Sequence, residues 1–227
     1  MEVFFKEMPE AVLVTGIGTD VGKSIATGWI ARELQHQAKS VTGDTRSAVI
    51  TQKLIQTGNK DMSEDIETHR RIMGTGLLPR DLDHTTAPMI LSYPASPELA
   101  ARIDKVTLDF SVAEESTRRL ASEYRHVLIE GAGGVLVPLK RRYTTLDYIK
   151  ENKLPVIVVT NGQLGSINHT LLTLEILRRE NVDVYAVVYN PYFDSDKVIS
   201  ADTVEYLRDW ISEMMPATKY VLMPEKI

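Results

Sequence analysis

Short apolar runs alternate along this chain with longer segments whose apolar residues recur at helical spacing. The apolar runs are rich in β-branched residues and predict strands at residues 12–15, 48–51, 127–129, 156–159, 185–188 and 220–222. The segments between them predict helices at residues 25–37, 63–73, 97–103, 111–124, 143–151, 169–180 and 201–214. Strands that are buried on both faces lack a polar face, so continuous apolar runs favour a parallel sheet with helices on both faces.

The order of these elements predicts an α/β fold with a doubly wound, mainly parallel sheet. No internal repeat, low-complexity tract or proline-rich linker interrupts the alternation. A chain of 227 residues is long enough to bury a sizeable core. We therefore expect residues 1–227 to form a single domain.

Composition and charge exclude several classes of function. The net charge is −5 and no long basic run occurs, so we expect no nucleic-acid partner. The chain has no cysteine, which excludes disulfides and a thiol nucleophile. The first ten residues carry acids and no apolar signal-peptide core, and no segment reaches the roughly 18 apolar residues of a membrane helix. We expect a cytoplasmic protein without a membrane anchor.

Residues 16–24, Gly-Ile-Gly-Thr-Asp-Val-Gly-Lys-Ser, lie between the first predicted strand and the first predicted helix. A glycine-rich turn in this position points backbone N–H groups and the positive end of the helix dipole at one point, which suits a phosphate. Lys23 is then placed to reach the outer phosphates, and the Ser24 hydroxyl to bind Mg²⁺. The spacing departs from the general phosphate-loop pattern, because five residues separate Gly16 from Gly22 where the pattern has four.

Polar side chains follow the other predicted strands, and parallel strands bring their carboxyl ends to one edge of the sheet. Glu130 follows an apolar run and precedes a glycine cluster, the place of an acid that holds magnesium directly or through water. Lys53 is a second lysine at the same edge, suited to neutralising charge during phosphoryl transfer. The alternative for Glu130 is a capping or surface acid, and the alternative for Lys53 is a solvated surface lysine.

Two further segments allow two interpretations each. Asp65 lies at the start of a predicted helix with Ser63 as its candidate N-cap, and is either a metal ligand or an acid favoured by the helix dipole. Residues 165–169 form a second glycine turn before a helix, which is either an anion site, for a carboxylate for example, or an ordinary cap made by Ser166 or Asn168. His169 is expected to be structural, because no partner acid marks it as a base.

Four stretches, in this order, resemble the dethiobiotin synthetase family: residues 18–24, 52–58, 129–134 and 164–169. This family closes a ureido ring on 7,8-diaminononanoate with CO₂ and ATP, through a carbamate and a carbamic–phosphoric anhydride. Its phosphate loop is elongated, so the unusual glycine spacing supports the resemblance. Three features depart from the family: Leu54 replaces a proline, residues 42–47 look like an extra turn, and residues 223–227 end the chain early, which suggests relaxed nucleotide selectivity.

The resemblance implies a role for each matching residue. Lys53 and Lys23 would be catalytic, and Thr57 and Asn168 would contact the substrate. Ser24, Asp65 and Glu130 would bind Mg²⁺. The ATP contacts would be Thr19, Asp20, Val21, Gly22, Lys23, Ser24, Ile25, Asp65, Glu130, Gly131, Ala132, Gly133, Asn190, Pro191, Pro224 and Glu225, the last four near the adenine. Family members act as homodimers, with the substrate near the interface.

Two other functions remain open at this stage. One is a partition or regulatory ATPase of the P-loop NTPase group, which would act as a switch without a metabolite substrate. Such proteins carry an additional lysine at the beginning of the phosphate loop, and residues 15–18 contain none. The other is a non-catalytic nucleotide-binding module, which would need neither Lys53 nor Glu130.

Overall fold

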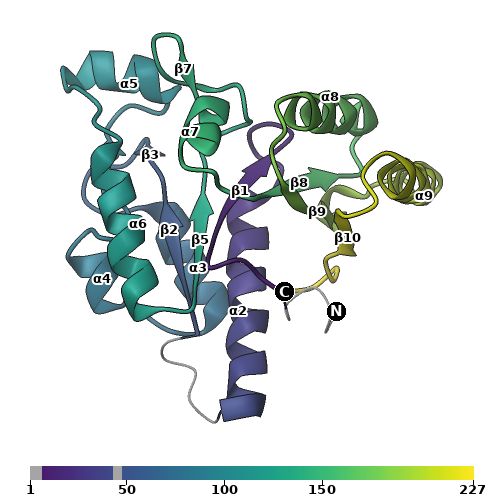
Figure 1. The fold of residues 1–227 in the computed structure, drawn as a ribbon, viewed down its shortest axis with the longest axis horizontal. Helices are drawn as coiled ribbons and strands as arrows, with labels where there is room; N and C mark the ends of the chain where they lie inside the picture. The colour runs from purple at the N-terminus through teal and green to yellow at the C-terminus, as the bar shows by residue number, and fades with distance from the viewer. Residues whose placement is uncertain (1–6, 43–47) are drawn as a thin grey trace.

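The computed structural model describes residues 7–42 and 48–227 (Figure 1). Within these residues a six-stranded sheet runs in the order β10-β9-β8-β1-β5-β2, and every neighbouring pair is parallel. The strands are β1 (Ala11–Gly16), β2 (Val49–Lys53), β5 (His126–Glu130), β8 (Val156–Asn161), β9 (Val184–Asn190) and β10 (Lys219–Leu222). The predicted parallel sheet is confirmed. Of the predicted extra turn, Thr42 ends a helix and residues 43–47 lie outside the described residues.

The helices connect these strands and lie on both sides of the sheet (Figure 1). They are α2 (Lys23–Thr42), α3 (Glu64–Met73), α4 (Pro79–Leu82), α5 (Pro97–Asp104), α6 (Ser111–Glu123), α7 (Thr145–Glu151), α8 (Ser166–Arg179) and α9 (Lys197–Met214). The prediction of a helix from residue 143 is wrong at its start, because Tyr143 and Thr144 form a short strand, β7. Thr144 caps α7 by accepting a hydrogen bond from the Asp147 N–H.

Several short elements were not predicted, because each is too brief to show a hydrophobic period. β3 (Gln56–Thr57) pairs in parallel with β4 (Ile90–Leu91), and β6 (Pro138–Lys140) pairs antiparallel with β7 (Tyr143–Thr144). A 3₁₀ helix, η1 (Pro191–Phe193), follows β9 directly. These additions surround the carboxyl-end edge of the main sheet.

The core lies on both faces of the sheet, which is why the strands lack a polar face. Alternate residues of β1 point to opposite sides: Val12 and Val14 pack in the cluster that contains Trp29 of α2, while Leu13 packs in the larger cluster with residues of α6, α7, α8 and α9. Each of the three β1 residues is fully buried. The sheet is therefore doubly wound, as predicted.

Helices α2 and α3 approach each other closely at Gly28. A Cβ built on Gly28 would lie 3.0 Å from the side chain of Ile72 and 3.2 Å from the Cα of His69. The absence of a side chain at this position therefore allows α3 to lie directly against α2. This packing brings the first turn of α3 to the first turn of α2.

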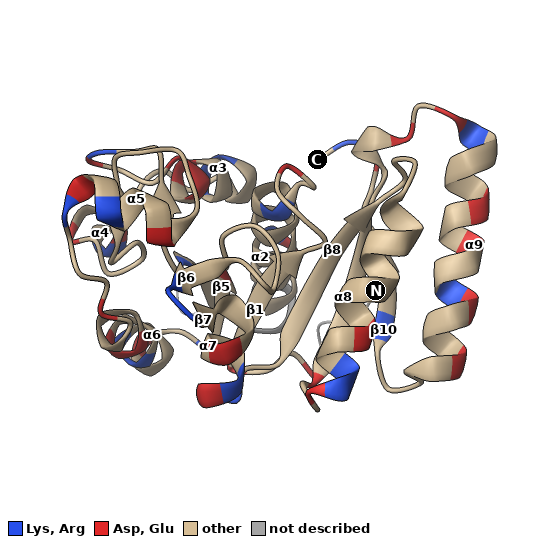
Figure 2. Ribbon diagram, turned by 90° about the horizontal axis from the view of Figure 1, so that it is seen from above, with Lys and Arg blue, Asp and Glu red and all other residues tan. Residues whose placement is uncertain are grey.

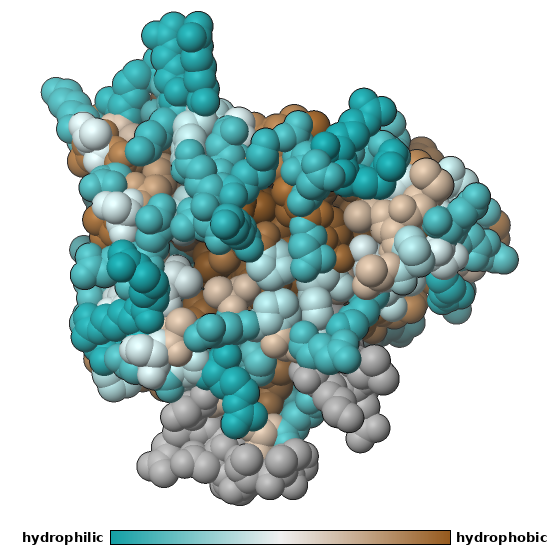
Figure 3. Space-filling view, in the orientation of Figure 1, coloured by the Kyte–Doolittle hydropathy of each residue, from teal (hydrophilic) through white to brown (hydrophobic). Residues whose placement is uncertain are grey.

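The outer surface is mostly polar. Figure 2 shows charged residues on the outward sides of α5, α6 and α9, and Figure 3 shows hydrophilic residues over most of one face, with hydrophobic residues visible between them. Among the described helices, none combines the length and apolar character needed to span a bilayer.

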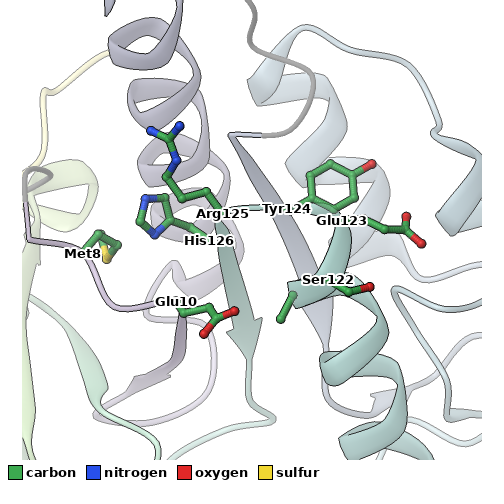
Figure 4. A pocket seen from close by; sticks show the side chains of 8 residues that line it. Met8, Glu10, Ser122, Glu123, Tyr124, Arg125 and His126 are labelled. Carbon is green, nitrogen blue, oxygen red and sulfur yellow. The ribbon is translucent and has the colours of Figure 1, made fainter. Parts of the chain in front are cut away.

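A hollow lies at the amino-terminal edge of the sheet, where the chain enters β5. Figure 4 shows Met8, Glu10, Tyr124, Arg125 and His126 around it. Glu130 lies at the other end of β5, so this hollow contains no predicted site residue. The candidate chemistry lies at the opposite, carboxyl-end edge.

Candidate active site

The phosphate loop occupies residues 17–22, between β1 and α2. Its backbone takes left-handed conformations at Asp20 (φ 57°) and Gly22 (φ 90°). Lys23 opens α2 and its Nζ donates a hydrogen bond to the Gly18 carbonyl at 2.8 Å, so the side chain curls back over the loop. Burial lowers the pKa of Lys23 to about 8, and the charge of Glu130 opposes this shift. A bound phosphate would stabilise the protonated lysine.

Asn190, the last residue of β9, supports the loop from the neighbouring side. Its Nδ2 donates to the Val21 carbonyl at 3.2 Å, and its Oδ1 accepts from the Tyr192 N–H at 3.1 Å. Gly22 is in contact with this amide: a Cβ at that position would lie 2.1 Å from Asn190 Nδ2. The left-handed φ and the close contact both require glycine here.

The glycine turn after β5 packs against the same loop. The Gly131 N–H donates to the Val14 carbonyl at 2.9 Å. A Cβ on Gly133 would lie 3.6 Å from Thr19 Oγ1. Gly133 therefore lies beside the loop that the sequence assigns to the phosphates, Gly131 is hydrogen-bonded to β1, and Ala132 lies between them in the chain.

Two carboxylates meet the hydroxyl of Ser24 at the start of α2. Ser24 Oγ lies 2.7 Å from Asp65 Oδ1 and 3.0 Å from Glu130 Oε1. Asp65 comes from the first turn of α3, where Ser63 caps the helix by accepting a hydrogen bond from the Ile66 N–H. Glu130 is the last residue of β5 and is fully buried. Residues far apart in the sequence thus form one oxygen cluster.

Lys53, the last residue of β2, lies between the two carboxylates. Its Nζ forms ion pairs with Asp65 and with Glu130 Oε1, the latter at 2.9 Å, and donates to the Gly131 carbonyl at 3.3 Å. Burial alone would lower the pKa of Lys53, but the charges of Glu130 and Asp65 raise the pKa above its usual value. Lys53 is therefore a buried, protonated amine and not a surface lysine.

His69 contacts Glu130 from the other side and was missed by the sequence analysis. His69 Nε2 lies 2.7 Å from Glu130 Oε2, and His69 Nδ1 lies 3.0 Å from Thr51 Oγ1. Burial by itself would raise the pKa of Glu130, but the Lys53 charge and the His69 hydrogen bond outweigh it and hold the pKa well below its usual range. One signal was available: His69 follows Asp65 by four residues, so both lie on one face of a helix.

The polar network continues away from the cluster through Arg70. Arg70 Nη1 donates to Thr51 Oγ1 at 2.8 Å, and the guanidinium forms a bidentate pair with Asp81 at 2.8 Å for each bond. Both side chains of this ion pair are buried. Asp81 also accepts hydrogen bonds from the Thr86 hydroxyl and the Leu78 N–H, so both oxygens of its buried carboxylate have hydrogen-bond donors in addition to Arg70.

The oxygen cluster fits Mg²⁺ by its donor chemistry. Ser24, Asp65 and Glu130 offer a hydroxyl and two carboxylates, the hard oxygen ligands that Mg²⁺ prefers. Over residues 7–42 and 48–227, no group of three or more His, Cys, Asp or Glu side chains forms a complete metal cage. A nucleotide-borne Mg²⁺ keeps waters and phosphate oxygens and takes only one or two protein carboxylates.

The remaining predicted residues make no recorded hydrogen bond with this cluster in the part of the chain that the structure describes. Thr57 ends β3 and is half-buried, and Asn168 is exposed in the first turn of α8, whose N-cap is Gly165 and not Ser166 or Asn168. His169 is exposed. Ile25 follows Ser24 in α2, Pro191 opens η1, and Pro224 and Glu225 are exposed beyond β10. The Met223 N–H donates to the Tyr189 carbonyl at 2.9 Å, which brings this last segment beside the end of β9.

Comparison with solved structures identifies the fold. A ParA family ATPase from Chlorobium tepidum superposes with a TM-score of 0.52, covering 96% of this chain and 84% of that chain at 14% identity. The MinC:MinD cell division protein complex of Aquifex aeolicus gives a TM-score of 0.55, covering 96% and 82% at 14% identity. At this identity the likeness concerns the fold, that of P-loop ATPases.

Sequence comparison identifies the family. A family model described as an AAA domain matches residues 10–213. The ATP-dependent dethiobiotin synthetase BioD 2 of Pasteurella multocida is 45% identical over 95% of this chain and 98% of its own length. The BioD 2 of Haemophilus influenzae is 46% identical over 85% of this chain and 96% of its own length. The BioD of Chlorobaculum tepidum is 42% identical over 87% of this chain and 80% of its own length. The chain therefore belongs to the dethiobiotin synthetase family of ATP-dependent ligases.

Proposed function

We propose that this chain uses ATP to carboxylate 7,8-diaminononanoate and close it into dethiobiotin, with release of ADP and phosphate, in the cytoplasm. The observation that carries the proposal is the Lys53 ammonium, held between Asp65 and Glu130 and beside Ser24 at the start of the phosphate-loop helix. A module that only bound nucleotide would need no second buried lysine at this edge of the sheet.

In the proposed reaction one amine of the substrate adds to CO₂, loses a proton and becomes a carbamate. A carbamate oxygen attacks the γ-phosphorus of ATP, the bond to the bridging oxygen breaks, and ADP leaves. The second amine then attacks the carbonyl carbon of the mixed carbamic–phosphoric anhydride, the bond from that carbon to the phosphate oxygen breaks, and the attacking nitrogen loses a proton to the departing phosphate or to water, which closes the five-membered urea and releases phosphate. None of these steps needs a thiol, which agrees with a chain that has no cysteine.

The phosphate loop and two lysines supply binding and charge in this scheme. The backbone N–H groups at the start of α2 bind phosphate oxygens, and Lys23 exchanges its contact with the Gly18 carbonyl for the outer phosphates. Lys53 donates to the transferring phosphoryl group, where charge develops in the transition state. Its present partners, Glu130 and Asp65, hold it protonated until then.

Mg²⁺ belongs to the same proposal. Ser24, Asp65 and Glu130 would hold it, and when bound it would neutralise charge on the phosphate oxygens. The adenine would lie near the ends of β9 and β10, against Asn190, Pro191, Pro224 and Glu225. The contact between Met223 and Tyr189 supports this part, because it joins the two segments.

We assign the substrate to Thr57 of one protomer and the amino terminus of α8 of its homodimer partner. Ser166 supports an anionic ligand at that helix end, because its Oγ is buried and makes no hydrogen bond within the part of the chain that the structure describes. Asn168 would contact the substrate carboxylate across a homodimer interface. The exposed Leu164 and Leu172, 90% and 62% accessible, favour such an interface near α8. A Leu172→Glu variant that sediments like the wild-type protein would count against it.

The decisive assay measures ADP release from ATP with and without 7,8-diaminononanoate and bicarbonate, together with the mass of the organic product. Turnover that requires the diamine, with formation of dethiobiotin, supports the proposal. Turnover indifferent to the diamine would reject it in favour of a P-loop regulatory ATPase without a metabolite substrate.

A further inference from the structure

The carboxylate of Glu130 divides its two oxygens between two sets of partners. Oε1 faces Ser24 at 3.0 Å and Lys53 at 2.9 Å, which are the groups assigned to the reaction. Oε2 faces only His69 among its recorded hydrogen-bond partners in the described chain, at 2.7 Å. His69 is fully buried and lies on α3, four residues after Asp65. It does not touch the phosphate loop in any recorded hydrogen bond.

The direction of the hydrogen bonds around His69 follows from its neighbours. Arg70 has only donors, so Thr51 Oγ1 accepts from Arg70 Nη1 at 2.8 Å. The single proton of the Thr51 hydroxyl is then directed to His69 Nδ1 at 3.0 Å. This leaves His69 Nε2 as the N–H group, and it donates to Glu130 Oε2. Every donor along the line Arg70, Thr51, His69 points towards the carboxylate, so one tautomer of His69 satisfies the whole network.

The far end of this line is fixed rigidly. Arg70 forms two hydrogen bonds of 2.8 Å with Asp81, and both side chains are buried. Thr51 belongs to β2, the strand that also carries Lys53, and Arg70 is the helical neighbour of His69. The imidazole is therefore held by a strand and by a buried ion pair, and its ring has little freedom to turn.

We propose that His69 is a positioning residue for Glu130: it binds Oε2 and thereby directs Oε1 to the face of the cluster where Ser24, Lys53 and the proposed Mg²⁺ meet. Without that hydrogen bond the Glu130 carboxylate would be free to rotate, or to accept hydrogen bonds from Lys53 on both of its oxygens. A partner that orients a ligating carboxylate affects metal binding by about ten- to a hundredfold. The inference rests on the proposed role of Glu130 as a magnesium ligand.

The test is the dependence of ADP affinity on magnesium chloride, measured by calorimetry on the full chain, with and without EDTA. His69→Leu removes both hydrogen bonds, and we expect the gain in ADP affinity on adding magnesium to fall by about tenfold, with affinity in EDTA unchanged. His69→Gln retains an amide donor near the position of Nε2 and should restore most of the gain. The shorter side chain of His69→Asn places its amide near the position of Nδ1, so it can contact Thr51 but not Glu130, and this variant should lose the magnesium effect as His69→Leu does. His69→Asn replaces His69→Leu in the test if His69→Leu does not fold.

Ile66→Ala is the matched control, because Ile66 is buried on the same helix and makes no recorded contact with Glu130. It should lower the melting temperature yet leave the magnesium effect intact. A His69→Leu protein with the wild-type magnesium effect, or an Ile66→Ala protein with the same loss, would overturn the inference. If wild-type ADP affinity does not respond to magnesium at all, the proposed magnesium site fails instead, and the two failures are distinguishable.

Discussion

The side-chain amide of Asn190 donates a hydrogen bond of 3.2 Å to the backbone carbonyl of Val21, across a sequence separation of 169 residues. This contact ties the end of β9 to the phosphate loop. Replacing the amide by alanine leaves the Val21 carbonyl without this partner and the loop without its lateral support. We expect Asn190→Ala to weaken ADP binding by about tenfold, which corresponds to about 1.4 kcal/mol.

Calorimetric titration with ADP checks this expectation. Asn190→Asp should bind more weakly still, because a carboxylate cannot donate to the carbonyl. Asn152→Ala is a suitable control, since Asn152 caps the end of α7 shortly before β8 begins and makes no recorded hydrogen bond with the phosphate loop. Equal affinities for the wild-type and Asn190→Ala proteins would show that the loop holds its shape without the amide.

Two glycines of the same loop should respond differently to alanine. Gly22 has a φ of 90° and its Cβ would lie 2.1 Å from Asn190 Nδ2, whereas a Cβ on Gly18 would meet no atom within 4 Å. Gly22→Ala should cost about 1–3 kcal/mol of stability, and Gly18→Ala only a few tenths. Thermal melting of the two variants without nucleotide measures the difference. Similar melting temperatures would contradict the conformation described for the loop.

Lys53 should be essential for turnover. Lys53→Ala removes the cation between Asp65 and Glu130 and the proposed charge contact to the phosphoryl group, so ADP release should fall by well over tenfold. Lys60→Ala is the control, because Lys60 is exposed on the loop after β3. Near-normal turnover in Lys53→Ala would remove Lys53 from the mechanism.

The buried Arg70–Asp81 pair should matter more for stability than any surface pair. Asp81→Asn leaves the Arg70 guanidinium buried without its counter-charge, which typically costs about 3–5 kcal/mol. Arg178→Ala breaks an exposed pair on α8 and should change the unfolding midpoint little. Urea unfolding of both variants provides the comparison. If the two midpoints shift equally, the pair at Arg70 is not the anchor described above.

His126 should make stability depend on pH. Its Nδ1 donates to the Pro9 carbonyl at 3.0 Å, while burial lowers the pKa of His126 below its usual 6.5. Below pH 6.5 the unfolded chain therefore takes up a proton that the folded chain resists, and stability falls as the pH drops towards the folded pKa. Above pH 6.5 both states are neutral and the effect vanishes.

The check is a series of melting temperatures between pH 5 and 7.5 for the wild-type and His126→Asn proteins. Below pH 6.5 the melting temperature of the wild-type protein should fall more steeply with decreasing pH than that of His126→Asn. Parallel curves would mean that His126 titrates alike in the folded and unfolded states.

The sheet could be predicted because its strands are buried on both faces. Runs such as residues 156–159 are apolar without interruption, and all six predicted strands occur within a few residues of the predicted positions. Helix starts were less accurate. α9 begins at Lys197, four residues before the prediction, because Asp196 caps it and its first turn lacks a clear apolar period. Local caps override periodicity at element ends.

The cluster itself was predictable only in part. Lys53, Asp65 and Glu130 were placed at one edge by topology and by the family resemblance, and their contacts with Ser24 follow from that edge. His69 was missed, because a histidine inside an amphipathic helix carries no motif of its own. Its contact with Glu130 depends on how closely α3 lies against α2, a distance that no local pattern records.

That distance depends on Gly28, which has no side chain to separate the two helices. The proposed nucleotide and magnesium ligands come from both of them: Lys23 and Ser24 from one, Asp65 from the other. A single methyl group at position 28 would act as a spacer and move one set of ligands away from the other. Gly28 thus sets the distance between the phosphate loop and the carboxylates, although it would never touch a substrate.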